Sequence, residues 1–111
     1  MLSIAAACLG WLPPAIAAPG SWTQKAEMPA PASATASCVL DGILYVIGGN
    51  YPFDSPLRTV WAYDPQANSW VRKADMPTAR QFLSAAAVDG IIYVIGGIWY
   101  KGTPPVLSVA A

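Results

Sequence analysis

A short stretch of sequence occurs twice in the chain, and this duplication constrains the fold more than any other feature. Residues 41–49 are Asp-Gly-Ile-Leu-Tyr-Val-Ile-Gly-Gly, and residues 89–97 differ from them only by Ile in place of Leu. The two copies lie 48 residues apart. A segment repeated at a fixed spacing of this size indicates a repeat protein, in which each copy belongs to one structural unit.

The similarity extends well upstream of the repeated stretch. Residues 22–49 align with residues 70–97 without a gap, and an acidic residue is kept where Glu27 aligns with Asp75. The identical pairs in the first half of this alignment are Trp22/Trp70, Lys25/Lys73, Ala26/Ala74, Met28/Met76 and Pro29/Pro77. One unit therefore spans about fifty residues.

Each copy of the repeated stretch predicts a β-hairpin. Asp41-Gly42 lies between two apolar runs, Ala36–Leu40 and Ile43–Ile47, and an Asp-Gly pair in this setting favours a two-residue turn with positive φ at both positions. Gly48-Gly49 then ends the second strand and permits a tight reversal or a close backbone approach. The second unit repeats these motifs at Asp89-Gly90 and Gly96-Gly97.

The rest of the unit predicts two more strands. Residues 50–56 are a polar loop that contains proline, and residues 57–63 alternate enough to form a third strand. Residues 64–68 have turn composition, and residues 70–74 are interpreted as a fourth strand. Four short antiparallel strands in about fifty residues are typical of one blade of a β-propeller, an all-β fold.

Large aromatic residues recur at set positions of the predicted sheet. Tyr45, Tyr63 and Trp70 each lie on a strand whose two faces pack against neighbouring blades. We interpret all three as core packing residues.

The chain closely resembles the kelch repeat family, from Ser21 to its last residue. The residues that carry the resemblance are Gly48-Gly49, Tyr63-Asp64-Pro65, Trp70, Met76-Pro77 and Arg80, with Gly96-Gly97 in the second unit. Arg80 follows Met76-Pro77, but the matching position in the first unit is Ala32. Any role that the family gives to this arginine is therefore implied for Arg80 alone. The resemblance implies a kelch-type β-propeller, which usually has five to seven blades.

The chain holds about two such blades. In the domain at 19–111, we expect a last strand around Trp22, a full blade at about 33–77 and a partial blade at about 78–111. Residues 105–111 align with residues 56–62 at a shift of 49 and predict the third strand of the partial blade.

An incomplete propeller leaves most faces between blades uncovered, because repeat arrays need about three or more units to bury a continuous core. Two explanations are open. The chain is a fragment of a longer protein that supplies the other blades, which we favour, or several copies assemble into a ring.

Residues 1–18 resemble a secretory signal peptide. The segment is apolar, has no charge, and ends in the small-residue pattern Ala15-Ile16-Ala17. The absence of a basic start leaves an unrelated apolar stretch as the alternative. Pro13-Pro14 and the limited length argue against an integral membrane protein. We therefore expect a secreted or periplasmic protein, in which Cys38 is a lone thiol, inert if buried.

Composition excludes several functions. The chain has no histidine, which removes the commonest metal ligand and general base. Formal net charge is zero, with six basic and six acidic residues scattered singly, so nothing indicates nucleic-acid binding. Cys8 and Cys38 form neither a disulfide framework nor a metal site. We expect no cofactor and no catalytic residues in this chain.

The resemblance implies binding of a protein, or of a glycan, through loops between the second and third strands and between blades. Trp99 and Tyr100 could instead pack on an adjacent blade, and for Arg80 we favour a structural hydrogen bond to blade carbonyls over ligand contact. The candidate binding residues are Tyr51, Phe53, Asp54, Arg80, Gln81, Trp99, Tyr100 and Lys101.

Two other functions remain as alternatives. The family also includes copper radical oxidases, which need histidine ligands that this chain lacks, and a sialic acid mutarotase, whose catalytic groups could lie in other blades. The chain could also be a purely structural part of a larger envelope protein. We expect a binding scaffold rather than an enzyme.

Overall fold

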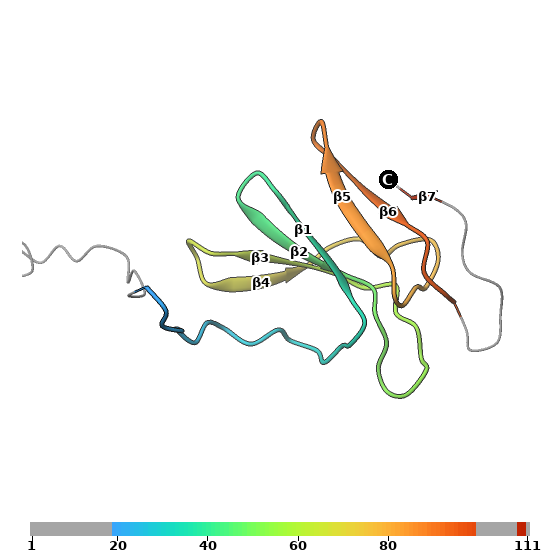
Figure 1. Ribbon diagram of the computed structural model, residues 1–111, viewed down its shortest axis with the longest axis horizontal. Coiled ribbons are helices and arrows are strands. Elements are labelled where there is room, and N and C mark those ends of the chain that lie inside the picture. Colours follow the sequence, from blue (N-terminus) through green and yellow to red (C-terminus); the bar gives the residue numbers. More distant parts are fainter. Residues whose placement is uncertain (1–18, 100–108, 111) are drawn as a thin grey trace, which may run out of the picture.

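The computed structural model of the chain describes residues 19–99 and 109–110. These residues form seven strands, without a helix, in two antiparallel sheets (Figure 1). The first sheet has the order β1-β2-β3-β4 and the second the order β5-β6-β7. The strands are β1 (Ala36–Leu40), β2 (Ile43–Ile47), β3 (Val60–Asp64), β4 (Ser69–Arg72), β5 (Ser84–Val88), β6 (Ile91–Ile95) and β7 (Val109–Ala110).

The two predicted hairpins are confirmed, with the predicted bounds for β1 and β2. Asp41 and Gly42 have φ values of 52° and 77°, and Asp89 and Gly90 have 49° and 78°. Positive φ at both turn positions matches the right-handed twist of the paired strands. Each hairpin therefore has a two-residue turn, with Leu40 opposite Ile43 in the first.

The third and fourth strands are shorter than predicted. β3 begins at Val60 rather than at residue 57, because the backbone of Leu57 bonds outside the sheet, to Gly49 and Arg80. β4 ends at Arg72 rather than at residue 74. Beyond Arg72, Lys73 N donates to Val60 O and Met76 N donates to Arg58 O, but these residues belong to no strand.

The strand predicted around Trp22 is wrong. Residues 22–28 belong to no strand, and the Trp22 side chain is 99% exposed. A strand requires a neighbour to satisfy its backbone groups, and none of the described residues flanks this segment as β3 flanks β4.

The third strand of the second sheet is present where the shift of 49 predicts it. Val94 and Ile95 of β6 lie opposite Ala110 and Val109. In the first sheet, Val46 and Ile47 lie opposite Trp61 and Val60 in the same register. The rest of the predicted strand lies outside the described residues.

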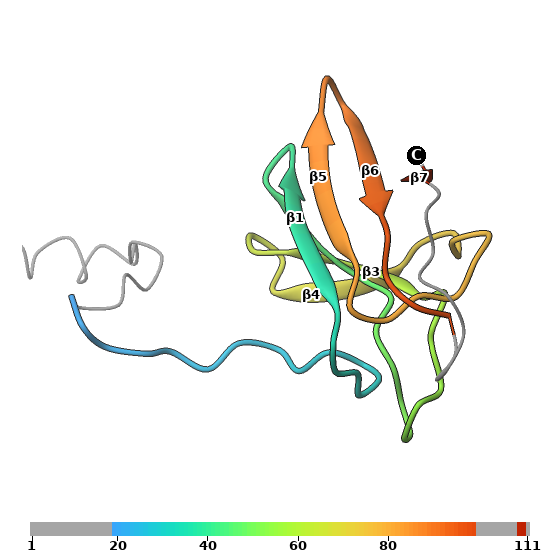
Figure 2. The ribbon, with the colours of Figure 1, turned by 45° about the vertical axis from the view of Figure 1, so that its right-hand side comes forward.

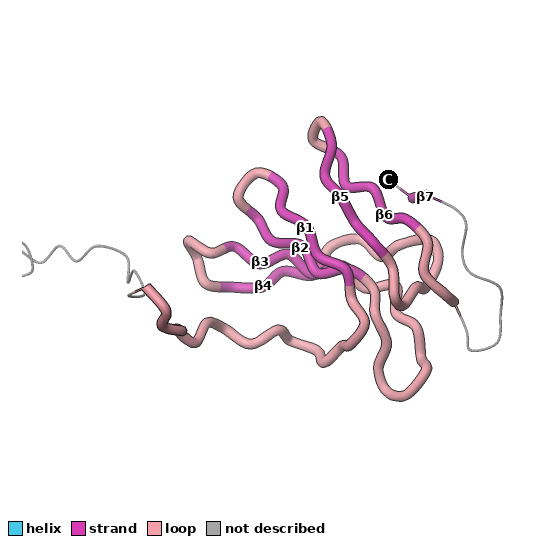
Figure 3. Tube along the Cα trace, in the orientation of Figure 1, coloured by secondary structure: helices cyan, strands magenta, loops and turns pink. Residues whose placement is uncertain are grey.

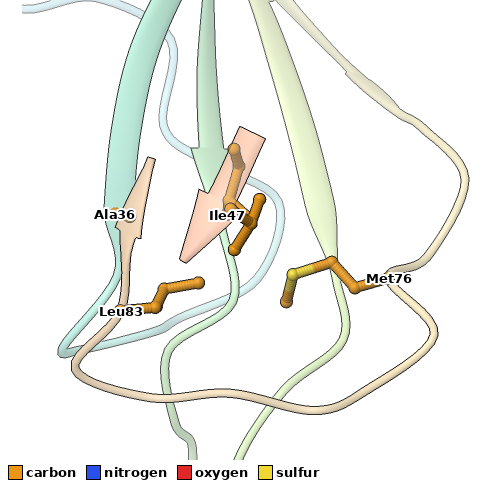
Figure 4. Packing of buried hydrophobic residues seen from close by; sticks show 5 residues of the cluster. Ala36, Ile47, Met76 and Leu83 are labelled. Atoms are coloured by element: carbon orange, nitrogen blue, oxygen red, sulfur yellow. The ribbon is translucent and has the colours of Figure 1, made fainter. Parts of the chain in front are cut away.

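The hydrophobic core lies between the two sheets, with β1 and β5 side by side (Figure 2). Ile47 of β2 is 1% exposed and packs among residues from both sheets and from the segment that joins them (Figure 4). The buried cluster comprises Ala36, Ile47, Met76, Leu83 and Val94. Tyr45, which was interpreted as a core residue, packs against it.

The predicted signal peptide at residues 1–18 lies outside the described residues. Within the part of the chain that the structure describes, no helix is long and apolar enough to cross a membrane.

Candidate functional site

The candidate loops gather at one end of the sheets. The β1–β2 and β5–β6 turns lie at the opposite end, and the long β2–β3 connection lies beside the segment that leads into β1 (Figure 3). Isolated bridges join Ser33 to Asn50, Leu57 to Arg80 and Gln81 to Ile98. These bridges hold loops that are distant in sequence next to one another.

The β2–β3 loop presents two aromatic side chains to solvent. Phe53 is 95% exposed and Tyr51 is 53% exposed. The loop is closed by a hydrogen bond from Tyr51 N to Ser55 O of 3.1 Å. Asp54 is exposed beside these aromatic residues. The loop projects beyond the sheet and offers apolar surface next to a carboxylate.

A hollow of about 420 Å³ lies between this loop and the segment before β1. Its lining is mostly apolar or aromatic, apart from Ser33 and Asn50. The lining residues are Pro31, Ala32, Ser33, Asn50, Tyr51, Pro52 and Phe53.

Asn50 links the hollow to the segment between the sheets, and sequence reasoning missed it. Its Nδ2 donates to Gln81 Oε1 at 2.6 Å, and its Oδ1 accepts from Ser33 Oγ at 3.3 Å. The sequence did hold a sign of it: Asn50 directly follows Gly48-Gly49, whereas the matching residue of the second unit is the apolar Ile98.

Arg80 and Gln81 are buried rather than presented on the surface. Both side chains are 1% exposed. The Arg80 guanidinium donates to the backbone oxygen of Gly96 at 3.1 Å, which is a structural hydrogen bond to a blade carbonyl. The two residues lie beneath the loops and support them.

The paired glycines of the first unit allow close approach of the two blades. A Cβ on Gly48 would lie 2.6 Å from Arg80 O, and Gly49 N donates to the same oxygen at 2.8 Å. Gly48 and Gly49 have φ values of 63° and 102°. These glycines therefore fix how the second blade sits on the first.

Two further aromatic residues lie at the same end. Trp99, a predicted candidate, is 54% exposed. Phe82, which sequence reasoning did not single out, is 68% exposed and has a φ of 55°, as its counterpart Ala34 does at 54°. Tyr100 and Lys101 lie outside the described residues.

Among the described residues, no group of three or more His, Cys, Asp or Glu side chains is placed to hold a metal ion. Burial raises the pKa of the Cys38 thiol, which lies on β1 away from the loops. The loops at this end thus present exposed aromatic side chains, among them Tyr51, Phe53 and Trp99.

The two sheets are blades of a β-propeller: short antiparallel strands, a core between the sheets, and loops gathered at the end of the blades. Residues 31–77 match the family model of the kelch motif. The chain thus contains a kelch motif, which spans β1 to β4 and the segment that follows. The paired glycines, Tyr63 and Trp70 of that motif are all structural in this fold.

Among solved structures, the chain is similar to that of YjhT, a kelch-type propeller protein, with 31% identity and a TM-score of 0.64. The match covers 73% of this chain and 25% of YjhT, so the chain spans about a quarter of that protein. None of the curated proteins matches the sequence.

Proposed function

We propose that the chain contributes two blades to a kelch-type scaffold that binds a protein partner through the loops at the Gly-Gly end. The observation that carries this proposal is the exposure of Phe53, at 95%, on a loop beside a hollow. Keeping a phenylalanine fully in water forgoes about 1.5–3 kcal/mol of burial free energy, and buried aromatic anchors are typical of protein interfaces.

The other exposed aromatic residues extend this surface. Tyr51 and Trp99 are each about half exposed, and Phe82 more so. The partly buried hydrogen bond from Asn50 Nδ2 to Gln81 Oε1, at 2.6 Å, joins the β2–β3 loop to the segment between the sheets. A rigid frame favours binding, because less conformational entropy is lost when the loops engage a partner.

A carbohydrate is the alternative ligand. Tyr51 and Phe53 line the hollow together with the amide of Asn50, and aromatic faces beside polar groups also suit a sugar. In that case the chain would belong to a carbohydrate-active protein such as an enzyme that interconverts the anomers of sialic acid.

Export forms part of the proposal. The apolar residues 1–18, with Ala15-Ile16-Ala17 near their end, support secretion or a periplasmic location. Mass spectrometry of the chain recovered from cells tests this: cleavage after Ala17 or Ala18 is expected, and an intact N-terminus on a cytosolic chain would overturn it.

The binding proposal is tested with Phe53→Ala and a matched control, Val71→Ala. Val71 is 53% exposed but lies on β4, away from the loops. Proteins captured from the exported fraction by the full chain are purified and titrated against each variant. We expect Phe53→Ala to weaken binding by at least about tenfold, or about 1.4 kcal/mol, and Val71→Ala to have no effect.

Equal affinity of both variants for the captured protein would overturn the proposed surface. A parallel NMR measurement of aldose anomer exchange separates the alternatives. Acceleration of exchange by the chain, lost in Phe53→Ala, would favour the carbohydrate function over protein binding.

A further inference from the structure

The hollow between the β2–β3 loop and the segment before β1 is built on backbone pairing that belongs to the repeat. Ser33 N donates to Asn50 O at 3.0 Å, and Asn50 N donates to Ser33 O at 2.8 Å. Gln81 and Ile98 form the same two bonds in the second unit, at 3.0 Å and 2.9 Å. An apolar side chain therefore serves this pairing as well as asparagine does.

The two segments that line the hollow are held close together at Gly49. Its φ is 102°, and a Cβ there would collide with the carbonyl oxygen of Ser33. The β2–β3 loop then projects beyond the sheets (Figure 1). The hollow has a volume of about 420 Å³, which lies within the range of ligand-binding pockets.

Asn50 adds hydrogen-bonding capacity that the backbone pairing does not need. Its Nδ2 donates one N–H to Gln81 Oε1 at 2.6 Å, and its Oδ1 accepts from Ser33 Oγ at 3.3 Å. A side-chain amide nitrogen carries two N–H groups. The structure gives the second one no acceptor among the described residues. Since Asn50 lines the hollow, this N–H is available to an occupant that carries an acceptor.

The rest of the lining favours an uncharged, apolar occupant. None of the described residues that line the hollow is charged, so a charged group placed there would lose its hydration without gaining a counter-ion. Tyr51 and Phe53 provide aromatic rings, and Pro31 and Pro52 provide further apolar surface. The occupant must therefore combine apolar surface, no charge and a hydrogen-bond acceptor.

A proline-rich segment in the polyproline II conformation has all three properties. Its rings are apolar, and its backbone carbonyls make no internal hydrogen bonds, so they can accept from a protein side chain. Such segments dock in aromatic-lined grooves. A phosphorylated or acidic motif would instead require a cluster of exposed arginines, whereas Arg80 is 1% exposed.

We propose that the hollow binds an uncharged, proline-rich segment of the partner protein in the polyproline II conformation. The prolines pack against the rings of Tyr51 and Phe53, and one backbone carbonyl of the segment accepts from Asn50 Nδ2. This inference rests on the proposed protein-binding function and names the part of the partner that the loop surface recognises. The segment is largely ordered before it binds, so little conformational entropy is lost.

Selection from a phage-displayed library of random peptides, with the full chain as bait, tests the chemistry of the occupant without assuming its sequence. We expect the peptides that bind the wild type but not Phe53→Ala to be enriched in proline and depleted in Asp, Glu, Lys and Arg. Enrichment of charged or proline-free peptides would overturn the proposal. So would a selection that yields no peptide dependent on Phe53.

The proposed hydrogen bond is tested by titrating the most enriched peptide, labelled for fluorescence anisotropy, against Asn50→Asp. Aspartate still accepts from Ser33 Oγ, and it can accept from Gln81 Nε2 once that amide rotates by half a turn, but it has no N–H to donate. Gln81 Nε2 is buried and has no partner among the described residues, so the rotation breaks no other bond. We expect at least about tenfold weaker binding, with thermal unfolding close to that of the wild type.

Two further variants complete this titration. Asn50→Ile introduces the residue that the second unit has at this position, and it should weaken binding similarly because it also removes the donor. Val71→Ala, on β4, should bind as the wild type does. Unchanged affinity of both Asn50 variants would overturn the proposed contact. Tighter binding by Asn50→Asp would indicate a cationic occupant and would overturn it as well.

Failure of this inference differs from failure of the proposed function. If the captured partner protein loses affinity for Phe53→Ala while the selected peptides lack proline, the loop surface binds its partner through another chemistry and only the inference fails. If Phe53→Ala binds the captured protein as the wild type does, the proposed function itself fails.

Discussion

Ile47 and Ile95 occupy the same position in two copies of one repeat, yet Ile47 is 1% exposed and Ile95 is 47% exposed. The difference arises from the neighbouring blade, because Met76, Leu83 and Val94 cover Ile47. The sequence of a blade sets its pleat and its apolar faces, but burial of those faces depends on the next unit.

This pair gives a direct prediction about stability. Ile47→Ala should lower the free energy of unfolding by about 2–5 kcal/mol, because it leaves a cavity between the blades. Ile95→Ala should cost less than about 1 kcal/mol in the monomer, since much of the side chain is already in water. Urea unfolding in dilute solution measures both; equal losses would contradict the assigned core.

The paired glycines predict a second asymmetry. Alanine at Gly42 meets no atom within 4 Å and suffers only from a φ of 77°, which costs about 1–2 kcal/mol. Alanine at Gly48 suffers the same strain and also places its Cβ 2.6 Å from Arg80 O. We expect Gly48→Ala to cost about 1–3 kcal/mol more than Gly42→Ala in urea unfolding. Similar costs would show that the blades do not approach closely at Gly48.

Variants at Tyr63 and Asn68 should lose stability in proportion to the hydrogen bonds that they remove. Its Oδ1 accepts from the Tyr63 hydroxyl at 2.7 Å and from Ala26 N at 2.9 Å. Tyr63→Phe removes one of these bonds and should cost about 0.5–1.5 kcal/mol. Asn68→Gly removes both while tolerating the φ of 48°, and should cost more, about 1–3 kcal/mol.

Asn68→Asp is the control for this series, because it keeps an acceptor oxygen and the tolerance of positive φ. Thermal unfolding of all the variants gives the order. If Asn68→Gly were no worse than Tyr63→Phe, the bond that holds residue 26 to the β3–β4 turn would contribute nothing.

Local chemistry explains why the hairpins were predictable. Asp41-Gly42 specifies positive φ at both turn positions, and the β-branched run that follows can be placed only as a strand. The start of β3 was predicted too early because Leu57 O accepts from Arg80 N, a contact between blades that no local pattern encodes.

Trp22 shows the limit of repeat reasoning. Its likeness to Trp70 predicted a strand, but a strand exists only where a neighbouring strand satisfies its backbone. Likewise, Arg80 and Gln81 were placed among the candidate binding residues because they lie in a loop, while the structure buries both. A single sequence shows which residues lie near a turn but not which of them the adjoining blade covers.

Cys38 gives a prediction about pH. Its thiol packs against the core, and burial raises its pKa above the ordinary value of 9.0 because the thiolate is poorly solvated there. The folded chain therefore keeps the proton at pH values where the unfolded chain loses it. The contribution of the protonated thiol to the free energy of unfolding is therefore complete below pH 9.0, and it is lost as the pH rises through the pKa of the folded state.

We expect the urea midpoint of the wild type to fall more steeply above pH 9.0 than that of Cys38→Ala, which lacks the titrating group. Alkylation of Cys38 by iodoacetamide, followed by peptide mass spectrometry, gives an independent measurement. Because the thiolate is the nucleophile, alkylation at pH 8 should be slower in the folded chain than in urea. Equal alkylation rates, together with parallel pH profiles for the two proteins, would mean that Cys38 is as well solvated in the blade as in the unfolded chain.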